Sequence, residues 1–164
     1  MEELYTTWKA IGVAGGDLSF FQDFFVKFYQ AFIEGDRWLQ YLNGVKTTLL
    51  VTALALILGI VLGVLVAMLR TAHDQQRPGH RNPILAVLNL ICKIYVTVIR
   101  GTPMMVQLLI MGFVIFASSR NFTMIGTLTL GINSGAYVSE IVRSGLMSVD
   151  PGQMEAGRSL GMNY

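Results

Sequence analysis

Residues 44–69 read GVKTTLLVTALALILGIVLGVLVAML, an apolar run whose only charge is Lys46 near its start. A helix of this length exceeds the roughly 20 residues that cross a bilayer, so the run predicts a transmembrane helix. Trp38 and Tyr41 come just before it, where aromatic rings favour the membrane–water interface. We therefore expect an all-α integral membrane protein, built as a helical transmembrane bundle.

The composition of the whole chain agrees with a membrane protein. Hydrophobic residues make up 53% of its 164 residues and charged residues 13%, about half the charged share of a soluble domain. A formal net charge of +2, without a basic aromatic patch, gives no indication of nucleic-acid binding. Cys92 is the only cysteine, which excludes a cysteine-based metal cluster. His73 and His80 lie in a polar loop, and we expect solvated side chains there rather than a metal site.

The charges on the two sides of this span predict its orientation. Residues 70–83 hold Arg70, Arg77 and Arg81 against one aspartate, whereas residues 1–43 hold three basic and six acidic residues. By the positive-inside rule the 70–83 loop is cytoplasmic and the amino terminus lies outside. The chain opens with three residues, Met-Glu-Glu, that lack the basic start of a secretory signal peptide.

Residues 1–43 are expected to form an external or interfacial amphipathic segment. Aromatic residues recur at helical spacing from 20 to 32, and polar residues, among them the i,i+4 pair Asp23 and Lys27, interrupt them. Such a stretch is too charged for a span and fits a helix lying in the headgroup region. A helix packed on a partner protein stays as the alternative.

Residues 84–117 are too long for one span and nearly long enough for two. The first half has a polar stripe, which favours a half-buried interfacial helix over 84–100. The stripe consists of Asn89, Lys93, Thr97 and Arg100. A second span is then expected over 103–117 and a third over 123–149, which brings residue Tyr164 to the cytoplasmic side.

A helix break is predicted at Arg100, Gly101, Thr102 and Pro103. Gly101 frees the backbone, and Pro103 disfavours the helical conformation at Thr102. The break separates the interfacial helix from the second span.

The first span has a small-residue face. Gly59, Gly63 and Ala67 recur at four-residue spacing, so another helix can pack closely there. We interpret this face as a helix-packing surface within the bundle.

The third span carries polar residues that a lipid-facing helix would not hold. They are Asn133, Ser134, Tyr137, Glu140 and Arg143. A charge at the bilayer centre costs about 2.5–3.5 kcal/mol, so these residues are expected to face the bundle interior or water. Two interpretations stay open. Glu140 and Arg143, three residues apart, pair with each other as boundary anchors, or the set lies along a solute pathway.

Residues 150–161, DPGQMEAGRSLG, predict a short capped helix directly after the third span. Asp150 is a good N-cap, Pro151 suits the first helical position, and Gln153 can reach back as in a capping box. The small residues Ala156, Gly157 and Gly161 allow a partner to come close, while Glu155 is available for a charged contact. A helix on a soluble domain would have the same pattern, but its position after a span favours a cytoplasmic coupling element.

Four blocks of the sequence resemble successive signatures of type I ATP-binding-cassette (ABC) importer permeases, in the polar amino acid branch that includes histidine, glutamine, glutamate and arginine systems. The blocks are GVKTTLLVT, YVTVIRGTPMMVQLL, SGAYVSEIVRSGL and DPGQMEAGRSLGM. The resemblance runs from about residue 36 to the end. The cytoplasmic loop of that family reads Glu-Ala-Ala, three residues, Gly. Glu155, Ala156 and Gly161 match this pattern, and Gly157 stands where alanine is usual.

The resemblance implies a permease subunit of an ATP-driven amino acid importer in a bacterial cell membrane. In that family the element around Gln153, Glu155, Ala156, Gly157 and Gly161 couples to cytoplasmic ATPase subunits. The implied partners are these ATPases, a second permease subunit, an external solute-binding protein and the lipid bilayer, with no nucleic acid. We expect no enzyme activity, cofactor or metal in this subunit, because ATP-Mg is used by the partner ATPases and no Walker-type loop occurs here.

The family pattern continues with Ile-x-Leu-Pro and further spans, so the resemblance implies three spans of an expected five and a truncated chain. A membrane anchor or adaptor, or a fragment that does not transport, stays as an alternative function. An ion-coupled carrier or channel is a further alternative, but it would need charged groups repeated across internal halves, and no such repeat is found.

Overall fold

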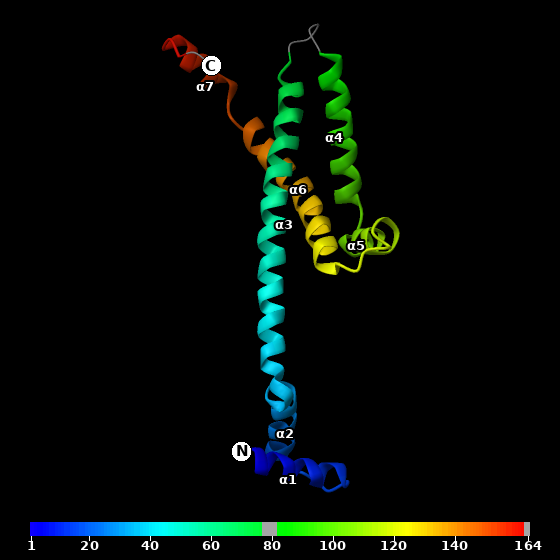
Figure 1. The fold of residues 1–164 in the computed structure, drawn as a ribbon. Helices are drawn as coiled ribbons and strands as arrows, with labels where there is room; N and C mark the ends of the chain where they lie inside the picture. Colours follow the sequence, from blue (N-terminus) through cyan, green and yellow to red (C-terminus); the bar gives the residue numbers. More distant parts are fainter. Residues whose placement is uncertain (77–81, 163–164) are drawn as a thin grey trace. The chain divides into compact units, whose positions relative to one another are not determined.

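The structure is a computed structural model that describes residues 1–76 and 82–162. Within these ranges the chain forms helices and no strand, which confirms the predicted all-α class. Arg77, Arg81 and Tyr164, which entered the topology prediction, and His80, which was expected to be solvated, lie outside the described residues. The chain divides into two compact units, Met1–Leu49 and Leu50–Tyr164, and helix α3 (Arg37–Asp74) contributes residues to both (Figure 1).

The first unit contains α1 (Glu2–Val13), α2 (Phe20–Phe32), the short helix η1 (Glu34–Asp36) and the first turns of α3. A capping box starts α2, in which Gln22 Oε1 accepts a hydrogen bond from the Ser19 N–H at 3.0 Å. The chain leaves α2 through Gly35 and Asp36, which both have positive φ angles, +64° and +55°. Since glycine adopts this conformation without strain, Gly35 makes the turn between α2 and α3 possible.

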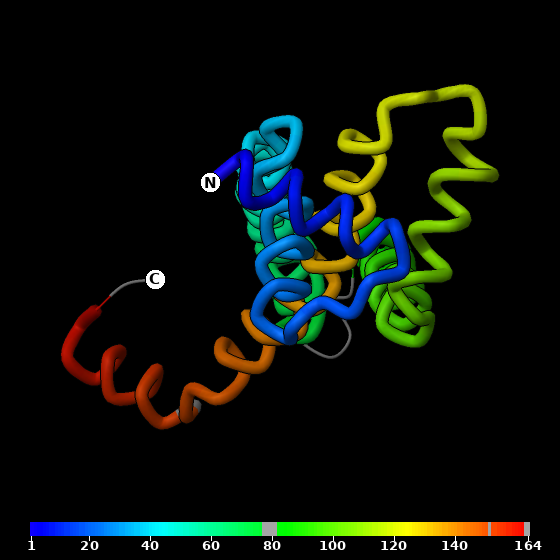
Figure 2. The backbone as a smooth tube through the Cα atoms, turned by 90° about the horizontal axis from the view of Figure 1, so that it is seen from below, coloured from blue at the N-terminus to red at the C-terminus, as the bar shows by residue number. Residues whose placement is uncertain are grey.

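The second unit contains the rest of α3, α4 (Pro83–Gly101), α5 (Met104–Ile110), the π-helical turn η2 (Met111–Ile115), α6 (Phe122–Met147) and α7 (Pro151–Ser159). In Figure 1 α4 runs antiparallel to α3, and α6 runs in the same direction as α3. Val66 of α3 packs with Cys92 and Val96 of α4 in a small buried core. Figure 2 shows α5 and η2, in yellow-green, extending to one side before the chain returns as α6.

Two helices of the described residues are long and apolar enough to cross a membrane, one over Glu34–Asp74 and one over Pro83–Gly101. The apolar stretch Met104–Ile115 is shorter. By length and composition, α4 therefore qualifies as a span where an interfacial helix over 84–100 was predicted. The expected second span over 103–117 is divided between α5 and η2. The third expected span, over 123–149, corresponds to α6. The polar residues of α6 lower its hydropathy, so it is not among the helices that are apolar enough to cross a membrane.

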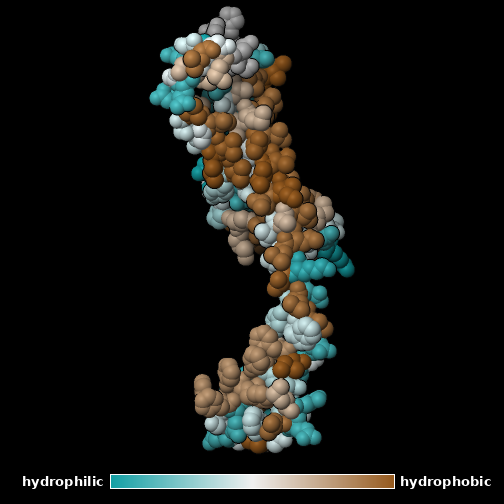
Figure 3. Space-filling view, turned by 90° about the vertical axis from the view of Figure 1, so that its left-hand side faces the viewer, coloured by the Kyte–Doolittle hydropathy of each residue, from teal (hydrophilic) through white to brown (hydrophobic). Residues whose placement is uncertain are grey.

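Large apolar side chains of the second unit point outward. Leu56, Ile57 and Val61 of α3 are more than half exposed, as are Leu90, Ile91 and Ile94 of α4. Figure 3 shows apolar side chains, in brown, gathered over the middle of one face of the molecule. A soluble protein rarely exposes a patch of this size, whereas a lipid-facing helix bundle does. The assignment of each helix to a depth in the membrane stays a prediction.

Candidate functional site

The structure places α6 against the small-residue face of α3. A Cβ atom built on Gly59 would lie 2.8 Å from Ser134 Cβ, and one built on Gly63 would lie 2.6 Å from Val138 Cβ. Ala67, next on this face, is fully buried. The backbones of α3 and α6 therefore approach so closely that a larger side chain at either glycine would push the helices apart.

The face of α6 that meets α3 is also built from small residues. A Cβ atom on Gly131 would lie 2.6 Å from Leu58 Cδ2, and one on Gly135 would lie 3.0 Å from the Tyr95 hydroxyl oxygen. That hydroxyl donates a hydrogen bond to the Ile132 carbonyl at 2.6 Å, so α4 is fixed to the same part of α6. We call this contact between Gly59, Gly63, Gly131 and Gly135 the small-residue seam.

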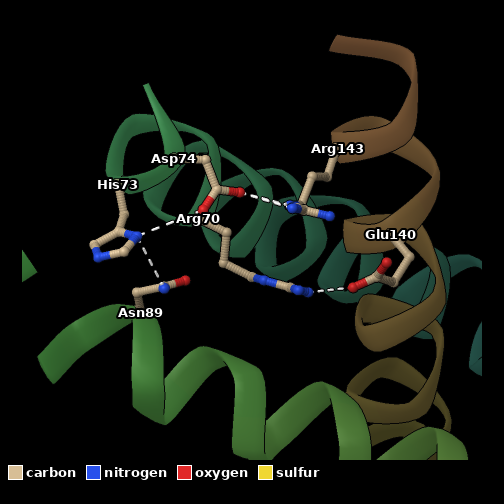
Figure 4. A network of polar contacts seen from close by, with 6 residues as sticks. All are labelled: Arg70, His73, Asp74, Asn89, Glu140 and Arg143. Carbon is tan, nitrogen blue, oxygen red and sulfur yellow. Dashed lines mark hydrogen bonds and ion pairs between the residues drawn. The ribbon is translucent and has the colours of Figure 1, made fainter. Parts of the chain in front are cut away.

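Past the seam, two ion pairs join α3 to α6 (Figure 4). Arg70 Nη1 donates to Glu140 Oε1, and Arg143 Nη2 donates to Asp74 Oδ2 at 2.7 Å. The Arg70 side chain is 12% exposed and that of Glu140 is 25% exposed. Charges this well shielded interact more strongly than surface pairs, because less water screens them. We call Arg70, Asp74, Glu140 and Arg143 the charged cluster.

The charged cluster corrects one of the two interpretations of the third span. Glu140 and Arg143 were considered as partners of each other, but each pairs with a residue of α3. The reason is that α3 continues past its predicted end at 69 to Asp74, so its last turn lies beside α6. Arg70 and Asp74 had been assigned to a loop, and a sequence pattern read one helix at a time cannot identify partners on another helix.

Arg100 also belongs to this region. Its guanidinium lies 3.9 Å from Glu140 Oε2, and its Cζ atom lies 5.2 Å from the centre of the Tyr137 ring. The arginine thus makes a cation–π contact with Tyr137 and a long ion pair with Glu140, while 42% of its side chain stays exposed. The predicted break residue Arg100 and the predicted pathway residues Tyr137 and Glu140 are brought together.

His73 lies in the last turn of α3 rather than in a solvated loop, so that expectation was wrong for this histidine. Its Nδ1 atom is 3.1 Å from Asn89 Nδ2 on α4 and 3.5 Å from Asp74 Oδ1 (Figure 4). Asn89 donates to this nitrogen when it is unprotonated. The contacts connect α4 to the charged cluster. The part of the chain that the structure describes holds no group of three or more residues able to bind a metal ion.

The predicted break is present between α4 and α5, and a residue not foreseen as functional bridges it. Gln107 Nε2 donates to the Ile99 carbonyl at 2.7 Å and to Thr102 Oγ1 at 2.8 Å. Asn133 Nδ2 of α6 donates to Gln107 Oε1 at 3.0 Å. A buried amide satisfied in this way holds the two helices at the break and ties them to α6. The signal was a glutamine inside the otherwise apolar stretch after Pro103.

Helix α7 follows α6 after a few residues and is capped at both ends. Asp150 Oδ1 accepts from the Gly152 N–H at 2.7 Å, while the described contacts include no return bond from the Gln153 side chain. At the other end Gly161 has a φ of +78°, and the Met162 N–H donates to the Gly157 carbonyl at 3.0 Å. This is the Schellman pattern, so Gly161 ends the helix instead of lying on its face.

The surface of α7 is open to a partner. Gln153, Glu155 and Ala156 are exposed, and Gly157 is half-buried. Leu160 and Met162, which follow the helix, are 82% and 69% exposed. A polar helix thus carries a small-residue surface next to exposed apolar side chains, an arrangement that suits a protein contact.

The outward-facing apolar helices and the polar contacts between them define a helical membrane protein. Residues 84–164 match the family described as "Binding-protein-dependent transport system inner membrane component". The chain is similar to the L-cystine transport system permease protein TcyB of Bacillus subtilis, with 34% identity over 136 residues, 80% of this chain and 53% of the relative. It is also similar to the arginine transport system permease protein ArgU of Corynebacterium glutamicum, with 35% identity over 132 residues, 71% of this chain and 38% of the relative.

Among solved structures, the chain is similar to a crystal structure of an amino acid ABC transporter with histidines. The TM-score is 0.57 and the identity 35%, and the match covers 77% of this chain and 58% of that chain. The chain spans about half the length of the curated relatives it matches. Residues 84–164, about half of this chain, are thus similar to the inner membrane components of binding-protein-dependent transport systems.

Proposed function

We propose that the chain acts in a permease subunit of an ATP-driven amino acid importer. The observation that carries this proposal is the capped helix α7, which follows the polar helix α6 and has the Glu155 and Gly161 of the family's coupling pattern. Relatives named as arginine and cystine permeases support amino acids as the class of solute. In this proposal the ATPase subunits bind ATP-Mg, and a second permease subunit and a solute-binding protein complete the transporter.

Helix α7 is proposed to bind the ATPase partner. Its exposed Glu155 supplies a charge, and Ala156 and Gly157 allow close approach. The Schellman turn at Gly161 fixes where the helix ends and places Leu160 and Met162 beside it. A short helix with defined ends can move as one piece when its partner moves.

The contacts between α6 and α3 are proposed to transmit this movement. The small-residue seam and the charged cluster join the two helices at two levels, so a push on α7 is passed through α6 to α3. Gln107 and Tyr95 add α5 and α4 to the same group of helices. Transport by alternating access needs such packed elements that move together between two arrangements.

The proposed topology has the amino terminus outside and α7 in the cytoplasm. It rests on the arginines after the first span and on the direction of α3 and α6 in Figure 1. A membrane-impermeant maleimide should label Asp17→Cys in intact cells and Gln153→Cys only after permeabilisation. Labelling of Gln153→Cys from outside would contradict this topology.

The coupling role is tested in the assembled transporter by charge reversal on α7. Glu155→Lys should abolish solute-stimulated ATP hydrolysis and uptake of radiolabelled amino acids, because it puts the opposite charge on the contact surface. Glu155→Asp is the matched control, because it keeps the negative charge at the same position of the exposed helix surface. Normal ATP-dependent uptake by Glu155→Lys would show that α7 does not couple in this way.

A further inference from the structure

The first unit has a face of α2 that nothing in the unit covers. Helix α1 packs on the opposite side, where the Tyr5 and Tyr29 rings stack with centroids 4.2 Å apart and Trp8 meets Phe25 edge-on at 5.4 Å. Val26 of α2 is buried as well. The aromatic residues of α2 thus divide into two sets, one that holds α1 and one that points away from it.

The second set forms a continuous row along the helix. Its members, between 44% and 80% exposed, are Phe20, Phe21, Phe24, Phe28 and Phe32. Neighbouring rings contact each other: Phe24 and Phe28 have centroids 6.3 Å apart, and Phe28 and Phe32 have centroids 4.9 Å apart. We call these five residues the phenylalanine row. Five adjacent exposed rings are a larger apolar surface than scattered single residues would give.

Two ion pairs of the unit are formed by residues outside this row. Asp23 and Lys27 pair at 2.7 Å on a neighbouring stripe of α2, and Lys9 of α1 pairs with Glu34 at 2.6 Å. The hydrogen bond to the Glu34 carboxylate raises the pKa of Lys9, so the lysine stays charged at neutral pH. The unit therefore has one aromatic face bordered by fixed charges, which is the pattern of a helix at a membrane surface.

The row continues into the start of α3. The Phe32 ring lies 5.3 Å from that of Tyr41, centroid to centroid. Tyr41 and Trp38 are both about half exposed, and they directly precede the apolar stretch that begins at residue 44. Aromatic rings at this position of a spanning helix lie at the headgroup level. The phenylalanine row is thus continuous with the aromatic residues that mark the membrane boundary of α3.

We propose that the phenylalanine row inserts into the headgroup–acyl boundary of the leaflet in which the apolar stretch of α3 begins. The occupant of this face is lipid, because the row is continuous with the interfacial aromatics of α3 and the Asp23–Lys27 ion pair lies on a neighbouring stripe of α2. This attachment concerns the first unit alone, so it does not rest on the transport function of α6 and α7. It gives the α1–α2 pair a fixed depth in that leaflet.

The test uses the full chain reconstituted in vesicles of phosphatidylethanolamine and phosphatidylglycerol. In a Cys92→Ala background, an environment-sensitive fluorophore is attached at Phe24→Cys or Phe21→Cys, with Lys27→Cys as the matched control on the charged stripe. Both phenylalanines are exposed, so their replacement removes little packing. Quenching is measured with a nitroxide lipid labelled near the headgroup and with aqueous iodide.

Labels at residues 21 and 24 should emit at shorter wavelength than the label at 27. The nitroxide lipid should quench them several-fold more strongly, and iodide should quench them less. Equal access of iodide to residues 24 and 27 would overturn the proposal. Protection of residue 24 from both quenchers would also overturn it, because the row would then be covered by a second copy or another protein.

Discussion

The small-residue seam and the charged cluster join the same two helices in different ways. At Gly59 and Gly63 the backbones of α3 and α6 meet at contact distance, whereas at Arg70 and Asp74 long side chains reach across. Close packing tolerates little added volume and does not depend on salt. Ion pairs adapt to small shifts but depend on burial and ionic strength. In the contact between α3 and α6, the small-residue seam therefore sets the distance between the helices, and the charged cluster holds their register.

The largest expected effect comes from adding volume to the seam. In Gly63→Leu, the new side chain would start 2.6 Å from Val138 Cβ and 3.0 Å from the Gly135 carbonyl oxygen. We expect a loss of about 3 kcal/mol of folding free energy, since overpacking forces the backbones apart. The measurement is the yield of monodisperse protein and its unfolding midpoint in detergent micelles.

The matched control for this substitution is Gly145→Leu on α6. A Cβ at Gly145 has no atom within 4 Å, so the same side chain should be accepted there. Equal losses of folding free energy in Gly63→Leu and Gly145→Leu would mean that the two helices pack less tightly at the seam than its contacts indicate.

A smaller loss of folding free energy is expected when the ion pair between Arg70 and Glu140, the more buried of the two, is broken. Arg70→Gln and Glu140→Gln should each cost about 2 kcal/mol, below the ~3–5 kcal/mol of a fully buried pair because both side chains keep some contact with water. The double variant should lose less than the sum of the two, which a double-mutant cycle on unfolding midpoints measures.

The same cycle discriminates between the structure and the pairing first considered from the sequence. Glu140→Gln and Arg143→Gln should have nearly additive losses, because the two residues belong to different pairs. Strong coupling between 140 and 143, with none between 70 and 140, would contradict the arrangement in Figure 4.

Hydropathy and spacing located the apolar run, the helix break and the capped helix, because these features depend on each helix alone. The run 44–69 lies inside α3, the break around Pro103 separates α4 from α5, and Asp150 caps α7. The bounds at helix ends were less accurate. Residues 70–74 were assigned to a loop because they are polar, yet contacts with Glu140 and Arg143 continue the helix.

The sequence pattern could not identify the contact partners of the polar side chains or the backbone conformation at a turn, and the reasons are physical. Which face of α6 meets α3 depends on how three helices pack together, so the partners of Glu140 could not be identified from i,i+3 spacing. Gln107 looked like one polar residue in an apolar stretch until the break brought Ile99 and Thr102 beside it. Gly161 was placed on the helix face because its left-handed φ depends on the turn that follows.

The smallest effect is expected at the second ion pair of the cluster. Both side chains of Asp74 and Arg143 are 28% exposed, and the pair lies at the end of α3. Asp74→Asn and Arg143→Gln should each cost about 1 kcal/mol, the upper part of the range for exposed pairs. Their coupling should fall toward zero in about 1 M salt, where the Debye length is about 3 Å. The loss caused by Gly63→Leu should stay unchanged in the same salt, because steric contact is not screened. If salt left the 74–143 coupling intact, this pair would be as shielded as the one between Arg70 and Glu140. The charged cluster would then act as a single buried network.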